Sequence, residues 1–89
     1  MINYITLGTN DLAKSAEFYD QLLEEFGAKR VMANERMVFW MSEGGGAGIS
    51  ICTPADEKKA TVGNGSMVAL AAENTEKVDD IYQKAIALG

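Results

Sequence analysis

The sequence predicts a single α+β domain, in which one β-α-β-β-β module is followed by a shorter β-α segment. Three observations lead to this prediction. Apolar residues alternate along several short stretches, which is typical of half-buried strands. They recur at helical spacing along two longer stretches. The C-terminal strand-and-helix pattern also repeats the N-terminal one. A chain of 89 residues, 47% of them hydrophobic, fits one globular domain.

The first unit covers residues 4–27 and is predicted to form a strand, a capped turn and an amphipathic helix. Apolar residues alternate with small or polar ones over residues 4–8. Asn10 and Asp11 follow, and either side chain can accept hydrogen bonds from the free N–H groups of a helix start. Gly27 suits the left-handed position that ends a helix. The apolar stripe of the helix consists of Leu12, Ala16, Tyr19, Leu22, Leu23 and Phe26.

Extended segments then alternate with turns. Asn34 and Glu35 are predicted to form a tight turn, and residues 43–48 form a glycine-rich connection. Pro54 ends a strand because proline cannot donate to a ladder. The remaining predicted elements are strands over residues 28–33, 36–42, 48–53 and 67–72, and a second helix that is capped by Asn74 or Thr75 and ends at Gly89.

The C-terminal segment repeats the first unit. Aligning Met67 with Tyr4 also aligns the two predicted helix caps, Asn74 with Asp11. Strand, cap and helix recur in the same order, but the second copy stops after its helix. We expect either a truncated form or a neighbouring chain that supplies the three missing strands. The predicted organisation within the single domain 1–89 is a first module (1–54), a linker (55–66) and a truncated second module (67–89).

Composition excludes several classes of function. The net charge is −5, from 8 basic and 13 acidic residues, and no basic run tracks phosphates. Nucleic acid and anionic membranes are therefore poor partners. The chain has no membrane-spanning apolar run and no secretory signal, and its one cysteine cannot pair within the chain, so we expect a cytoplasmic location. It contains no histidine, which removes the easiest routes to zinc catalysis and to a catalytic triad.

The opening MINYITLGTNDLAKSAEFYDQLLEEFGAK is similar to the usual start of the vicinal oxygen chelate superfamily. This superfamily includes glyoxalase I, bleomycin-resistance proteins and extradiol dioxygenases. The stretch CTPADEKKATVGNG also resembles the linker of small bacterial glyoxalase-like proteins, so the resemblance covers the whole chain. It implies a mixed, curved sheet that forms a cup for the ligand, with helices on the outer face. It also implies dimerisation, sometimes by exchange of modules. The superfamily hosts many chemistries, so the resemblance predicts fold better than function.

The same resemblance implies where metal ligands would lie. Metal-dependent members carry a histidine on the first strand, a glutamate or histidine on the fourth, and matching ligands in the second module. The corresponding positions here are Tyr4, Ser50 and Met67, none of which is a normal ligand for a divalent ion. We therefore expect a metal-free site without a cofactor, and the missing ligands count against glyoxalase I and dioxygenase activity.

A cavity on one face of the sheet is the predicted site. If Tyr4 faces the cup, alternation places the small and mixed residues of the other strands on the same face. The predicted ligand-binding residues are Tyr4, Thr6, Trp40, Ser50, Cys52 and Met67, and no residue is assigned a catalytic role. Other interpretations stay open. Cys52 also fits a small buried hydrophobe, Trp40 and Met67 also fit a core, and small residues also let another sheet or subunit approach.

Three functional hypotheses follow. The leading one is a small glyoxalase-like or bleomycin-resistance-like protein that binds a small organic molecule without a metal. The second is a lyase or isomerase of the glyoxalase (lactoylglutathione-lyase-like) kind, which takes its ligands or acid–base groups from a C-terminal extension or a partner chain. The third is a non-catalytic module that binds another protein. A homodimer is expected in any case, because a lone chain leaves an unclosed sheet edge.

Overall fold

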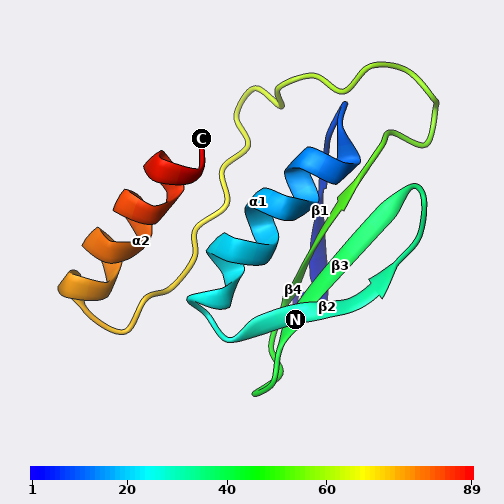
Figure 1. Cartoon of the computed structure of the whole chain (residues 1–89). Helices are drawn as coiled ribbons and strands as arrows, with labels where there is room; N and C mark the ends of the chain where they lie inside the picture. Colours follow the sequence, from blue (N-terminus) through cyan, green and yellow to red (C-terminus); the bar gives the residue numbers. More distant parts are fainter.

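A computed structural model describes all residues from Met1 to Gly89. A single four-stranded sheet carries helix α1 on one face, and helix α2 packs beside α1 (Figure 1). Neither helix combines the length and apolarity needed to cross a membrane. The elements are β1 (Tyr4–Gly8), α1 (Leu12–Glu24), β2 (Ala28–Ala33), β3 (Met37–Ser42), β4 (Gly48–Cys52) and α2 (Thr75–Leu88).

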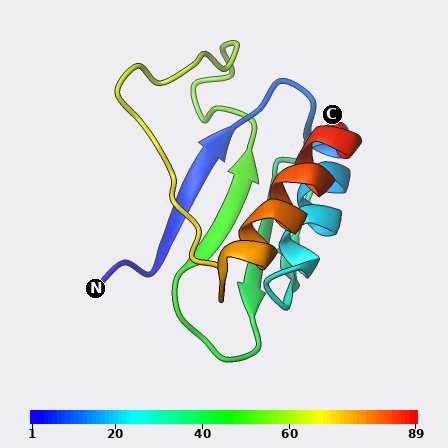
Figure 2. The same ribbon diagram turned by 90° about the vertical axis from the view of Figure 1, so that its left-hand side faces the viewer.

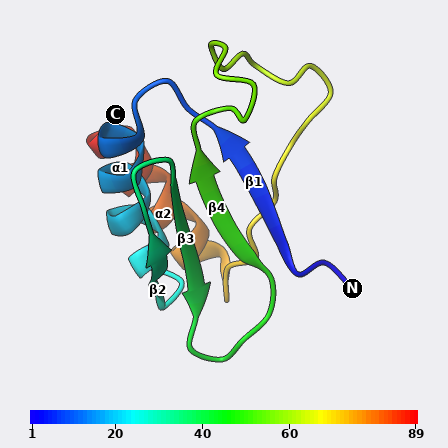
Figure 3. The same cartoon turned by 90° about the vertical axis from the view of Figure 1, so that its right-hand side faces the viewer.

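The strand order in the sheet is β1-β4-β3-β2, and the sheet is mixed (Figure 3). β1 runs parallel to β4, whereas β3 is antiparallel to both β4 and β2. The parallel pair is possible because α1 and the β2–β3 hairpin together form the long crossover that parallel strands require. β1 and β2 are therefore the two edge strands, and a register shift between Arg30 and Met32 bends β2.

The core lies between α1 and the face of the sheet that α1 covers. Its buried members are Ala16, Leu23, Val38, Trp40, Ile49 and Ile51. The predicted stripe of α1 supplies the helix side of this core, and the alternating positions of β3 and β4 supply the sheet side. Trp40 is only 1% exposed, and its indole Nε1 donates a hydrogen bond to Oδ1 of Asp20 at 2.9 Å.

Both helices begin where the repeat predicts. Oδ1 of Asp11 accepts a hydrogen bond from the backbone N–H of Lys14 at 3.1 Å, and Oδ1 of Asn74 accepts one from Lys77 at 2.8 Å. The predicted equivalence of the two caps is thus confirmed. Gly27 adopts the predicted left-handed conformation after α1, with φ at +69°.

Ion pairs join α2 to α1. The carboxylate of Glu25, just after α1, binds the Nζ atoms of both Lys77 and Lys84. No residue of α2 is fully buried, and Figure 2 shows α2 lying along α1 on the side away from the strands. One stripe of α2 remains in contact with solvent: Val78, Tyr82 and Ile86 are each more than half exposed.

The prediction of a strand over residues 67–72 was wrong. This segment belongs to a stretch between Thr53 and Asn74 that contains no helix and no strand. Three of its six residues are alanine, which has low strand propensity, and no neighbouring strand pairs with it. A strand is stable only when its backbone groups have ladder partners, so the pattern alone was insufficient.

The prediction that the sheet curves into a cup was also wrong. The four strands form one mixed sheet that is not strongly curled, with both helices on the same side (Figure 1). A cup needs strands on opposite sides of the ligand, and a single four-stranded sheet has them on one side only. The confirmed part of the predicted fold is therefore the β-α-β-β-β module followed by a C-terminal helix.

Candidate functional site

The face of the sheet opposite α1, called the open face below, gathers four of the predicted site residues. The cross-strand register places Thr6 beside Ser50, and Ser50 beside Phe39 on its other side. Side chains alternate along each strand, so the neighbours two positions away lie on the same face. The open face therefore consists of Tyr4, Thr6, Gly8, Met37, Phe39, Met41, Gly48, Ser50 and Cys52, with Lys29 and Met32 on the edge strand β2.

A pair of hydroxyl groups lies at the centre of the open face. Oγ1 of Thr6 and Oγ of Ser50 are 2.8 Å apart, and either can donate the hydrogen bond. Ser50 is fully buried at 0% exposure, whereas Thr6 is exposed. A molecule that lies on this face therefore reaches the hydroxyl of Thr6, whose oxygen is held in place by the hydrogen bond with Ser50.

An aromatic pair lies beside the hydroxyl pair. The rings of Tyr4 and Phe39 meet edge to face, with centroids 5.3 Å apart and planes at 70°. Tyr4 is 52% exposed, so its ring and hydroxyl are available to a ligand. Gly48 lies beneath Phe39, because a Cβ atom there would be 2.6 Å from Cε2 of that ring. The absence of a side chain at Gly48 thus makes room for the aromatic pair.

Phe39 was absent from the predicted site. Its position on the open face follows from the alternation of β3, in which Val38 and Trp40 take the other face. The useful signal in the sequence is this alternation combined with the glycine at the start of β4, since a glycine within a strand often marks a close approach.

The open face is almost free of charge. Lys29, on the edge strand β2, is its only charged residue, and Nζ of Lys29 lies 3.7 Å from Oε1 of Glu43. The two carboxyls with perturbed pKa values lie elsewhere. The Arg30 guanidinium lowers the pKa of Asp20, and hydrogen bonds from Lys77 and Lys84 lower the pKa of Glu25.

The linker covers one end of the open face, where β1 and β4 finish. A Cβ atom on Gly8 would lie 3.3 Å from Cβ of Ala60. Ala60 is held there by Asn10, whose Nδ2 donates to the Ala60 carbonyl at 3.1 Å and whose Oδ1 accepts from the Ala60 N–H at 2.7 Å. Cys52 lies beside Gly8 in the register and is buried with a free thiol.

Two predicted site residues lie away from the other four. Trp40 points from β3 into the core on the face that α1 covers, where its partners are Asp20 and Tyr19. Met67 lies on the irregular segment before α2 and is 88% exposed. The structure therefore brings together Tyr4, Thr6, Ser50 and Cys52, and leaves Trp40 and Met67 apart from them.

The whole chain, residues 1–89, matches the family model described as Glyoxalase/Bleomycin resistance protein/Dioxygenase superfamily. The chain belongs to this superfamily. No curated protein matches it significantly. This superfamily member is similar to a glyoxalase/bleomycin resistance protein from Albidiferax ferrireducens T118, with 36% sequence identity and a TM-score of 0.88. The match covers 100% of this chain and 70% of that chain.

Two further solved structures share the fold of this superfamily member. A glyoxalase-related enzyme from Fulvimarina pelagi is 26% identical, with a TM-score of 0.70 over 100% of this chain and 65% of that chain. A structure from Bacillus halodurans is 24% identical, with a TM-score of 0.74 over 98% of this chain and 68% of that chain. The resemblance inferred from the N-terminal motif is thereby confirmed as family membership.

The residues at the implied metal positions do not fit a divalent ion in this superfamily member. Ser50 Oγ is hydrogen-bonded to Thr6, and Met67 lies off the sheet, so the three positions do not converge. Tyr4 is the only one of the three that faces an accessible part of the sheet. No group of three or more His, Cys, Asp or Glu side chains lies close enough to hold a metal. Neutral hydroxyl and thioether donors are poor substitutes for imidazole and carboxylate.

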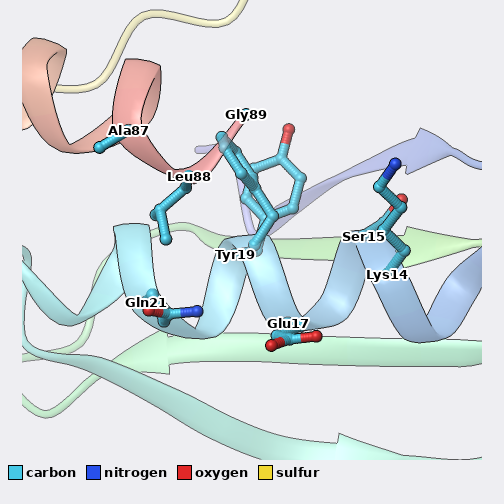
Figure 4. A pocket seen from close by; sticks show the side chains of 9 residues that line it. Lys14, Ser15, Glu17, Tyr19, Gln21, Ala87, Leu88 and Gly89 are labelled. Atoms are coloured by element: carbon cyan, nitrogen blue, oxygen red, sulfur yellow. The ribbon is translucent and has the colours of Figure 1, made fainter.

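A groove between the two helices is a hollow outside the open face. Its volume is about 570 Å³, and it is lined mainly by α1 and by the last residues of α2 (Figure 4). Tyr19 lines it from α1 and Leu88 from the end of α2, while Lys14, Glu17 and Gln21 lie along the exposed side of α1. The groove has no set of converging polar groups comparable to the hydroxyl pair of the open face.

Proposed function

We propose that the protein binds a small, uncharged organic molecule on the open face without a metal. The observation that carries the proposal is the juxtaposition of the Tyr4–Phe39 aromatic pair with the Thr6–Ser50 hydroxyl pair on a nearly neutral surface. Ligand sites typically combine apolar walls with a few well-placed polar groups. Superfamily membership supports the choice of this face.

The chemistry of the face favours a particular ligand. The exposed ring of Tyr4 offers an edge or face for contact with a planar apolar group. The hydroxyl of Thr6 supplies one oriented hydrogen bond, which suits a hydroxyl or carbonyl on the ligand. Lys29, the one charged residue of the face, is already paired with Glu43. A charged ligand would therefore lose its hydration without gaining an unpaired counter-charge, so an anion or cation is disfavoured.

A homodimer belongs to the same proposal. The open face touches only one side of a ligand, whereas small-molecule sites usually bury most of the ligand surface. A second copy would provide the opposite wall, and the unpaired outer edge of β1 offers a place for its chain to join. Static light scattering should give the mass of a dimer over a wide range of concentrations. A monomer throughout would remove this part of the proposal.

Phenol and benzoate form a matched pair of probes, because they share a ring and differ in charge. We expect phenol to shift the NMR signals of Tyr4, Thr6 and Phe39, and benzoate to shift them less. Thr6→Val should weaken phenol binding, and Tyr82→Phe on exposed α2 should leave it unchanged. Shifts confined to the groove between α1 and α2, or equal binding of both probes, would refute the proposal.

A further inference from the structure

A separate hollow, called the rim pocket below, lies where β1 and β4 end. Its volume is about 600 Å³. Three segments contribute to its walls: the β1–α1 turn, the β2–β3 turn, and the chain that follows β4. The residues that matter for its charge are Glu35, Arg36, Thr53, Glu57, Lys58 and Lys59.

The rim pocket collects most of the unpaired positive charge of the protein. Four of the eight basic residues are in ion pairs, namely Lys29, Arg30, Lys77 and Lys84. The other four have no carboxylate oxygen within 4.0 Å. Three of these four, Arg36, Lys58 and Lys59, line the rim pocket. The protein as a whole is acidic, with a net charge of −5, so a cluster of unpaired cations is not expected from its composition.

Two carboxylates also line the pocket, and they do not neutralise it. Glu35 and Glu57 both lie outside ion-pair distance of the three cations. The lining side chains, three positive and two negative, carry a net charge of +1, and the carboxylate of Asp56 lies next to them against the Lys58 N–H. Arg36 can also present two parallel N–H donors to an oxyanion, which is the geometry that favours arginine at carboxylate and phosphate sites.

Hydrogen bonds hold the backbone beneath these cations. The Arg36 N–H donates to Oδ1 of Asn34 at 2.9 Å, and the Arg36 carbonyl accepts from the N–H of Thr53 at 3.0 Å. On the other side, the Lys58 N–H donates to Oδ1 of Asp56 at 2.9 Å. The pair of hydrogen bonds between Asn10 and Ala60 anchors the linker just beyond Lys59. The cations therefore approach the pocket from two anchored segments.

We propose that the rim pocket binds a small, doubly charged oxyanion through Arg36, Lys58 and Lys59. Phosphate groups and dicarboxylates share this chemistry. The site is independent of the open face, which lacks such charges, so either proposal can fail without the other. The three cations are exposed, so binding should weaken steeply as ionic strength rises.

NMR titrations with inorganic phosphate and with malonate at constant low ionic strength test this proposal. We expect either anion to shift the amide signals of Arg36, Thr53, Lys58 and Lys59. Phosphate alone would identify a phosphate site, and malonate alone a carboxylate site. Loss of one charge-assisted hydrogen bond in Arg36→Gln should weaken binding about tenfold.

The fourth unpaired cation, Lys14 on α1, supplies the control. Lys14→Gln removes the same charge at an exposed position outside the rim pocket and should leave anion binding unchanged. The double variant Lys58→Gln/Lys59→Gln repeats the test from the other segment. Equal weakening by Lys14→Gln, or no shift in the pocket with either anion, would overturn the proposal.

Discussion

The indole N–H of Trp40 donates its hydrogen bond to Asp20, and the same carboxylate binds the guanidinium of Arg30 through both oxygens, at 2.7 and 2.8 Å. One side chain on α1 thus anchors a buried residue of β3 and an edge residue of β2. The Arg30 guanidinium also lies 6.0 Å from the centroid of the Trp40 ring. We regard this trio as the main polar connection between the helix layer and the sheet.

Replacing Asp20 with alanine should lower the free energy of unfolding by about 2 kcal/mol, because the buried Trp40 N–H would lose its acceptor. Asp20→Asn keeps an oxygen acceptor and should cost less than Asp20→Ala. Glu17→Ala, an exposed change on the same helix, should alter stability by less than about 0.5 kcal/mol. Urea unfolding measures all three. A loss for Glu17→Ala equal to that for Asp20→Ala would contradict the role assigned to the carboxylate.

Acid should destabilise the fold through two carboxyls. Arg30 lowers the pKa of Asp20, and Lys77 followed by Lys84 lowers the pKa of Glu25. A carboxyl whose pKa is lower in the folded state stabilises the fold fully above its unfolded pKa, which is about 4 for both residue types. That contribution is lost as the pH falls below about 4, through the lowered folded pKa values.

Urea midpoints measured from neutral pH down to pH 3 check this dependence. The double variant Asp20→Asn/Glu25→Gln should be less stable at neutral pH and should lose less stability on acidification. If wild type and variant lose stability in parallel, other groups control the acid response.

Gly48→Ala should destabilise the protein by about 2 kcal/mol, as overpacking of a tight site does. The new Cβ would meet the Phe39 ring at 2.6 Å and the Trp40 carbonyl oxygen at 2.8 Å. Gly44→Ala is the matched control, because a Cβ there has no neighbour within 4 Å. Adding Phe39→Leu to Gly48→Ala should restore only part of the stability, since the backbone contact remains. Thermal unfolding that is equal for the two alanine variants would refute the close approach.

The hydroxyl pair predicts non-additive effects. Thr6→Val leaves the buried Ser50 hydroxyl without a partner and should cost about 1 kcal/mol or more. Ser50→Ala leaves the exposed Thr6 hydroxyl free to bind water. The double variant should therefore cost less than the sum of the two single changes, because no buried hydroxyl remains. Chemical denaturation of the four proteins completes the cycle, and strict additivity would count against a direct hydrogen bond.

Local patterns in the sequence predicted most of the module. Alternation located β1 and β4, aromatic and branched residues located β3, and an extended stretch after Gly27 located β2. The candidate caps, Asn10 or Asp11 and Asn74 or Thr75, located both helix starts to within a residue or two. These features depend on neighbours close in the chain, so they can be predicted from the sequence alone. The alternation of side chains along a strand was enough to place Tyr4, Thr6, Ser50 and Cys52 on one face of the sheet. Their role in ligand binding stays a prediction.

The features that sequence reasoning missed depend on partners distant in the chain. Trp40 takes the helix-covered face, with Asp20 as its polar partner, whereas an isolated strand pattern leaves its face open. Residues 67–72 have a strand-like pattern, but no strand pairs with them in the sheet. The presence of Arg36, Lys58 and Lys59 in the lining of one pocket likewise depends on how two separate segments meet. No local pattern carries that information.

The position of β1 also constrains the order of events during synthesis. β1 leaves the ribosome before the other strands, yet its one partner in the sheet is β4, and the Thr6–Ser50 contact joins residues 44 positions apart. The nascent chain must therefore carry the apolar side of β1 unpaired while α1 and the β2–β3 hairpin emerge. Closing this long loop is slower than forming the local hairpin. Chaperones that recognise extended apolar segments have this interval in which to bind the β1 segment.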